Sequence, residues 1–175
     1  MDYTYQDVAK MIDHSLLNPT LTVAELDKGI QIALDYDVAS VCIMPYALKH
    51  CAEQLQGSAV KAGTTIGFPH GGHTTAIKVA EAEQALADGG EELDMMVNIS
   101  RVLSGEWDAV AADIRGHCAT PCCRRLSLEC AGQTAYCGFE NRVRNALLAG
   151  WCSISGDSAV AAFTGSAMAY RDVSN

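Results

Sequence analysis

Strand-like and helix-like segments alternate through the first two thirds of the chain. Short apolar runs of strand length predict buried strands at residues 38–44, 64–68 and 93–98. Helical patterns follow these runs at residues 46–56, 75–87 and 107–116. Such alternation predicts a parallel sheet with helical crossovers, which is either an open doubly wound sheet or a (β/α) barrel.

Local signals place the ends of several helices. Thr22 and Glu25 form a capping box, which predicts that a helix starts at this point. Gly89 and Gly90 end the helix of residues 75–87, because glycine suits the left-handed position after a helix. The glycine-rich phosphate loops of nucleotide-binding proteins do not follow any of the predicted strands, which disfavours nucleotide binding.

Composition restricts the partners of the protein. The 175 residues carry a net charge of −9 and are 49% hydrophobic, as expected for one globular domain spanning residues 1–175. The negative charge disfavours nucleic acid and anionic membrane surfaces as partners. The sequence contains no apolar run long enough to span a membrane, and its start does not resemble a secretory signal, so we expect a cytoplasmic protein.

The last third of the chain has a less regular pattern. It predicts a strand at residues 126–130, a helix at 141–149 and a short strand at 151–155. Six of the eight cysteines lie between Cys118 and Cys152, where they could be free thiols or could contribute to a zinc site. Their spacing does not form two Cys-x-x-Cys pairs, so thiols are the favoured interpretation.

Several segments resemble the deoxyribose-phosphate aldolase family in order and spacing. They are Ile-Asp-His-Ser-Leu-Leu-Asn-Pro at 12–19, Ala-Ser-Val-Cys-Ile-Met-Pro at 39–45, Thr-Ile-Gly-Phe-Pro-His-Gly at 65–71, Glu-Leu-Asp-Met-Met-Val-Asn-Ile at 92–99, and Leu-Ser-Gly-Glu-Trp at 103–107 continuing to Asp-Ile-Arg at 113–115. The resemblance covers about residues 11–115, whereas residues 116–175 match poorly. It implies a (β/α)8 TIM-barrel fold, here incomplete with about six strands.

The resemblance also implies an activity. The family is a lyase family of deoxyribonucleotide catabolism that reversibly cleaves 2-deoxyribose 5-phosphate into glyceraldehyde 3-phosphate and acetaldehyde. Its reaction passes through a lysine Schiff base and requires neither a metal nor an organic cofactor. A phosphorylated sugar or aldehyde is therefore the expected small-molecule partner. The free edges of an incomplete barrel would also favour association with a second copy.

Four residues match functional positions of the family. Asp94 matches the proton-relay aspartate, and strand alternation places it on the opposite face from Leu93. Asp13, Cys42 and Arg125 match positions near the substrate. Without the resemblance, Asp13 is equally consistent with a turn or capping residue, and Cys42 with a small core residue.

The loop at residues 67–72 has two interpretations. Its glycines could allow the backbone to approach a phosphate, but a tight turn is the favoured interpretation. His70 and His73 in and beside this loop could be metal ligands, yet no carboxylate or cysteine accompanies them at a suitable spacing. We therefore expect no metal site there.

The lysines depart from the family pattern. Ser155 stands where the resemblance implies the Schiff-base lysine, and no lysine follows Lys78. A hydroxyl cannot form an iminium, and Arg125 stays protonated, so neither side chain replaces a nucleophilic amine. Lys78 lies on a predicted helix, where we expect it to be a solvated surface residue.

Three hypotheses follow from these departures. The chain could be an active aldolase that uses another lysine such as Lys78. It could be a truncated or decayed aldolase, with the reading frame altered after about Gly116. It could also be a non-catalytic protein that binds a small molecule or a protein partner.

Overall fold

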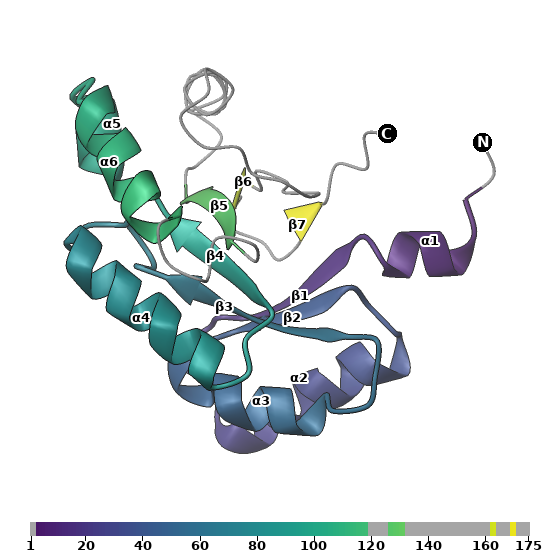
Figure 1. Cartoon of the computed structure of the whole chain (residues 1–175). Coiled ribbons are helices and arrows are strands. Elements are labelled where there is room, and N and C mark those ends of the chain that lie inside the picture. Colours follow the sequence, from purple (N-terminus) through teal and green to yellow (C-terminus); the bar gives the residue numbers. More distant parts are fainter. Residues whose placement is uncertain (1–2, 119–125, 132–161, 164–168, 171–175) are drawn as a thin grey trace.

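The computed structural model describes residues 3–118, 126–131, 162–163 and 169–170. Its strands form one sheet in the order β6-β5-β4-β3-β2-β1-β7 (Figure 1). The longer strands are β1 (Ile12–Leu16), β2 (Ser40–Ile43), β3 (Lys61–Ile66), β4 (Glu92–Met96) and β5 (Leu126–Ala131). Two-residue strands flank them, β6 (Ala162–Phe163) beside β5 and β7 (Ala169–Tyr170) beside β1.

The pairing of these strands distinguishes the two expected architectures. Each of β2 to β5 pairs in parallel with the strand that precedes it in the chain. A doubly wound sheet reverses its strand order at a switch point, whereas a (β/α) barrel keeps the sequential order. The sheet therefore has the strand order of the barrel, as the resemblance implied.

Helices connect the successive parallel strands. They are α2 (Val23–Asp35) after β1, the 3₁₀ turn η1 (Pro45–Ala47) with α3 (Leu48–Gln54) after β2, α4 (Thr75–Ala87) after β3, and α5 (Ile99–Leu103) with α6 (Trp107–Cys118) after β4. A short helix, α1 (Tyr5–Ala9), precedes β1. Figure 1 shows α2, α3 and α4 along one side of the sheet. None of the helices in the described ranges is long and apolar enough to cross a membrane.

The capping signals read from the sequence match the helix ends. The backbone N–H of Thr22 donates to a carboxylate oxygen of Glu25 over 2.8 Å, which completes the predicted capping box. The predicted helix at 75–87 has the same bounds as α4. The backbone of Gly89, just after α4, has a φ of +93°, in the left-handed region that favours glycine.

The hydrophobic core lies between the sheet and the helices. It includes Ile30 of α2, Ile43 of β2 and Leu48 of α3, all of which have no exposed surface. Leu93 and Met95 of β4 belong to the same core, as does Val97 just beyond the strand. Burying such side chains stabilises the fold by roughly 1.5–3 kcal/mol each.

The opposite face of the sheet is polar. Because side chains alternate along a strand, the residues between the core positions point away from the helices. We call this the inner face, and its small and polar members on β1 to β4 are Asp13, Ser15, Ser40, Cys42, Gly63, Thr65 and Asp94. By the same alternation Lys61 and Glu92, at the starts of β3 and β4, and the buried Met96 also belong to it. The predicted separation of Asp94 from Leu93 and Met95 agrees with this division.

The prediction for Lys78 is wrong. Its side chain is fully buried on α4, and its Nζ donates to a carboxylate oxygen of Asp113 over 2.7 Å and to the carbonyl of Met96 over 2.8 Å. The other carboxylate oxygen of Asp113 accepts a hydrogen bond from the hydroxyl of Thr75 over 2.7 Å. The ion pair thus joins α4, α6 and the carboxyl end of β4, which is why the lysine tolerates removal from water.

His14 on β1 should make stability depend on pH. Its Nε2 is buried without a hydrogen-bond partner in the described part of the chain, and burial lowers the pKa of the imidazole below its ordinary value of 6.5. The folded state therefore resists protonation. Neutral His14 therefore contributes to the free energy of unfolding. This contribution is complete above the unfolded-state pKa and is lost as the pH falls through the folded-state pKa.

We expect the urea midpoint of unfolding to fall between about pH 7.5 and about pH 5.5, and to fall less in His14→Gln. The glutamine cannot take up a proton in this range, so the folded and unfolded states no longer differ in the protons bound at position 14. His73→Gln removes an exposed imidazole and is the matched control. An equal fall in the wild type and in His14→Gln would contradict the assignment to His14.

Candidate functional site

Two of the predicted site residues meet on the inner face. The thiol of Cys42 on β2 donates to a carboxylate oxygen of Asp94 on β4 over 3.4 Å. Cys42 is almost fully buried, whereas Asp94 is half-buried. A partly exposed carboxylate on this face can exchange protons with a bound small molecule, as general acid–base chemistry requires.

The contact between Cys42 and Asp94 crosses the strand that separates them. Strand β3 lies between β2 and β4, and its residue Gly63 pairs with Cys42 in the register of the sheet. Gly63 has no side chain on the inner face, so it leaves room for the thiol and the carboxylate to meet. A Cβ at this position would lie only 3.3 Å from the backbone oxygens of Val41 and Glu92.

Asp13 lies on the same face but has a different partner. One of its carboxylate oxygens accepts a hydrogen bond from the hydroxyl of Ser40 over 2.6 Å. Ser40 begins β2 and pairs with Asp13 in register, two residues before Cys42. Asp13 is half-buried and belongs to the sheet itself, so the alternative of a capping residue does not describe it.

Two residues that the sequence analysis singled out lie outside the described residues. These are Arg125, predicted to lie near the substrate, and Ser155, where the resemblance implies a Schiff-base lysine. The predicted helix at 141–149 and strand at 151–155 also fall there. The described part of β5 pairs with β4, where Ser127 is the register partner of Asp94.

The loop after β3 is a tight turn, which was the favoured interpretation. Gly67 and Gly71 have positive φ values of +71° and +63°, and the N–H of Gly71 donates to the carbonyl of Gly67 over 2.9 Å. A carboxylate oxygen of Glu81 on α4 accepts from the N–H of Gly67 over 2.7 Å. This bond fixes the start of the loop at the carboxyl end of β3.

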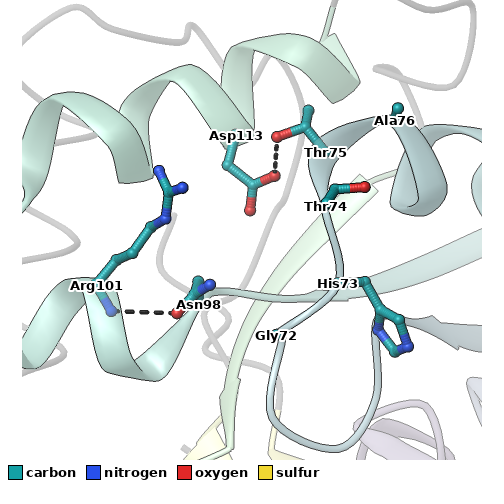
Figure 2. A pocket seen from close by; sticks show the side chains of 8 residues that line it. All are labelled: Gly72, His73, Thr74, Thr75, Ala76, Asn98, Arg101 and Asp113. Carbon is teal, nitrogen blue, oxygen red and sulfur yellow. Dashed lines mark hydrogen bonds between the residues drawn. The ribbon is translucent and has the colours of Figure 1, made fainter.

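A cavity of about 380 Å³ lies beyond this loop (Figure 2). Residues 72–76 line one side, and Asn98, Arg101 and Asp113 line the other. Figure 2 shows the carboxylate of Asp113 directed toward Thr75, and the ring of His73 pointing away from Asp113. Asp113 is already paired with Lys78, so its charge is compensated.

The described residues do not assemble a metal centre. The rings of His70 and His73 stack with centroids 6.5 Å apart, but no group of three histidine, cysteine or carboxylate side chains converges within the described ranges. Structural zinc sites need four such ligands at about 2.0–2.3 Å. The described residues therefore offer no set of ligands for zinc.

Thr65 on β3 is a further inner-face residue that the sequence patterns did not single out. Its side chain has no exposed surface, and its hydroxyl has no hydrogen-bond partner among the described residues. Thr65 pairs in register with Asp94, so the two share the inner face. The signal available in the sequence was strand alternation, which separates Thr65 from its neighbour Thr64.

Comparison with known proteins adds to this geometry. Residues 7–125 match the model of the DeoC/LacD family of aldolases. A deoxyribose-phosphate aldolase of Rhodopirellula baltica is 71% identical over 113 residues, which are 65% of this chain and 47% of that protein. One of Lactiplantibacillus plantarum is 48% identical over 105 residues, covering 60% of this chain and 49% of that protein. The chain spans about half the length of the curated relatives it matches.

Solved structures of aldolases share the fold. A putative deoxyribose-phosphate aldolase from Coccidioides immitis superimposes with a TM-score of 0.74 and 28% identity, over 85% of this chain and 59% of that one. The structure described as QR15, an aldolase, gives a TM-score of 0.76 with 27% identity, over 92% of this chain and 70% of that one. The family match and the barrel-type strand order agree, and the chain belongs to the DeoC/LacD family of aldolases.

Proposed function

We propose that the inner face carries the acid–base part of a 2-deoxyribose-5-phosphate aldolase site, with Asp94 as the group that relays protons. The reaction would be the reversible cleavage of 2-deoxyribose 5-phosphate into glyceraldehyde 3-phosphate and acetaldehyde. The observation that carries the proposal is the half-buried Asp94 carboxylate, which contacts Cys42 on the inner face of a barrel-type sheet. The names of the relatives support the substrate class.

The chemistry of this cleavage requires an amine. Breaking the carbon–carbon bond leaves an electron pair on the carbon beside the carbonyl, and an iminium accepts that pair better than a neutral carbonyl does. A lysine must be deprotonated to form the iminium, so its surroundings have to lower its pKa. Asp94 can move protons between intermediates, but a carboxylate cannot form the iminium itself.

Lys61 shares the inner face by strand alternation, but it lies at the start of β3 and its amine is paired with Glu92 rather than offered to Asp94. The other four lysines are placed away from Asp94. Lys28 and Lys49 are exposed on α2 and α3, on the helical side of the sheet. Lys10 is held in a partly exposed ion pair with Asp37. Lys78 is buried against Asp113.

We therefore propose that the 175-residue polypeptide binds a small aldehyde or sugar phosphate without efficient turnover. This is the non-catalytic hypothesis applied to an aldolase-type site, and the lysine positions favour it over the use of Lys78. The position of Ser155 supports it as well, because the resemblance implies an amine there. Ligand binding and amine chemistry can be measured separately.

Incubation with acetaldehyde and borohydride should leave every lysine unlabelled by mass spectrometry under conditions that trap an authentic Schiff base. Calorimetric titration of the same protein with 2-deoxyribose 5-phosphate should still detect binding, and Asp94→Asn should change the affinity. Asp35→Asn removes the same charge from an exposed position on α2 and is the matched control. Efficient turnover, or a trapped Lys78, would contradict the proposal for this polypeptide.

A further inference from the structure

Strand β3 contains two neighbouring threonines with opposite environments. Both side chains have no exposed surface. The hydroxyl of Thr64 donates to the backbone carbonyl of Ile43 over 2.6 Å. The hydroxyl of Thr65 has no hydrogen-bond partner in the part of the chain that the structure describes. Two residues of the same type thus differ in whether the protein satisfies their polar group.

The two threonines face opposite sides of the sheet. Thr64 lies between Ala62 and Ile66, which belong to the core beneath the helices. Thr65 alternates with them and shares the inner face with Asp94, its register partner on β4. Neighbouring strands lie about 4.8 Å apart, so the Thr65 hydroxyl comes within reach of a molecule held against the Asp94 carboxylate once the side chains that cover it shift, as side chains at binding sites commonly do.

A buried hydroxyl without a partner weakens the folded state, because the group has given up its hydrogen bonds to water and received none in return. Valine has nearly the same shape and would avoid this cost. Unsatisfied buried groups are rare in native proteins, and a role at a ligand site is one physical explanation for keeping one. The half-buried Asp94 beside it provides that site.

We propose that the Thr65 hydroxyl is a specificity-determining contact, which hydrogen-bonds to a hydroxyl or carbonyl oxygen of the small aldehyde or sugar that lies against Asp94. This inference rests on the proposed function of the inner face. A site built to hydrogen-bond a ligand oxygen discriminates against ligands that lack it, because its own polar group is then left unpaired. Thr65 would thereby favour polyhydroxylated ligands over apolar aldehydes of similar size.

The test compares Thr65→Val and Thr65→Ser with the wild type by calorimetric titration with 2-deoxyribose 5-phosphate and by thermal unfolding. Thr65→Val should bind about five- to tenfold more weakly, the effect of losing one hydrogen bond between uncharged groups. Its unfolding midpoint should rise, because the unsatisfied hydroxyl has been removed. Thr65→Ser keeps the hydroxyl and should bind within about twofold of the wild type.

Thr64→Val is the matched control. It removes a hydrogen-bonded hydroxyl from the core side and leaves the carbonyl of Ile43 without this donor. It should therefore lower the midpoint of unfolding and leave the affinity for 2-deoxyribose 5-phosphate unchanged. Equal affinities of the wild type and Thr65→Val would overturn the inference alone. A fall in both midpoint and affinity in Thr65→Val would also overturn it, since the hydroxyl would then support the fold. Absence of binding to the wild type would overturn the proposed function and this inference together.

Discussion

Lys78→Met is expected to lower the free energy of unfolding by about 3–5 kcal/mol, the usual cost of removing one partner from a buried ion pair. Methionine has a similar length but lacks the amine, so the Asp113 carboxylate would remain buried without the cation that Lys78 supplies. The carbonyl of Met96 would lose its donor as well. Urea unfolding monitored by circular dichroism measures the change.

Lys61→Met is the matched control for this prediction. Lys61 pairs with Glu92 over 2.9 Å, close to the 2.7 Å of the buried pair, but 46% of its side chain is exposed. A surface pair contributes only about 0–1 kcal/mol, because water screens the charges. Similar losses in the two variants would mean that burial does not strengthen the Lys78 pair. The double variant Lys78→Met with Asp113→Asn should recover part of the loss, since no unpaired charge remains.

Gly71→Ala is expected to destabilise the protein by about 2–5 kcal/mol. The left-handed backbone of Gly71, at φ +63°, costs a non-glycine residue about 1–2 kcal/mol. A Cβ there would also lie 2.0 Å from the backbone oxygen of Val97, and relieving such a clash costs a further 1–3 kcal/mol or so. The loop after β3 would have to move away from the end of β4. Chemical denaturation measures the loss of stability.

Gly57→Ala separates these two effects. Gly57 has a φ of +84°, but a Cβ added there would meet no atom within 4 Å. It should therefore show only the backbone cost, about 1–2 kcal/mol. If Gly71→Ala were no more destabilising than Gly57→Ala, the close packing of the loop on β4 would be refuted.

Sequence patterns predicted the elements that have strong local signals. The helix at 75–87 was bounded correctly because glycines follow its last turn, and β4 was assigned its two faces because apolar and polar residues alternate along it. Strand β1 was not predicted, since Asp13, His14 and Ser15 interrupt its apolar character. The five-residue helices α1 and α5 also lack the length over which helical periodicity becomes visible.

The error at Lys78 has an identifiable cause. The buried residues of α4 are Lys78, Ala82 and Ala85, spaced as i, i+4 and i+7 on one helical face. The small alanines mark this stripe only weakly, and a lysine on a helix is usually exposed. Its partner Asp113 lies 35 residues away on α6, so the pairing depends on tertiary packing.

The meeting of Cys42 with Asp94 shows the same limit. The resemblance selected both residues one at a time, but their contact depends on the register of β2, β3 and β4 and on the missing side chain at Gly63. Thr65 escaped notice because the failure of a hydroxyl to find a partner is visible only once its surroundings are known. These are properties of long-range packing, which local patterns do not encode.

The sequential pairing of β1 to β5 has a consequence for biosynthesis. Each of these strands adds to the strand translated just before it, so the sheet can grow one unit at a time as the chain leaves the ribosome. Only modest loops have to close at each addition, which keeps the entropic cost low. The antiparallel pairing of β7 with β1 differs, since it joins Tyr170 to Ile12 and must await the synthesis of about 150 further residues after β1.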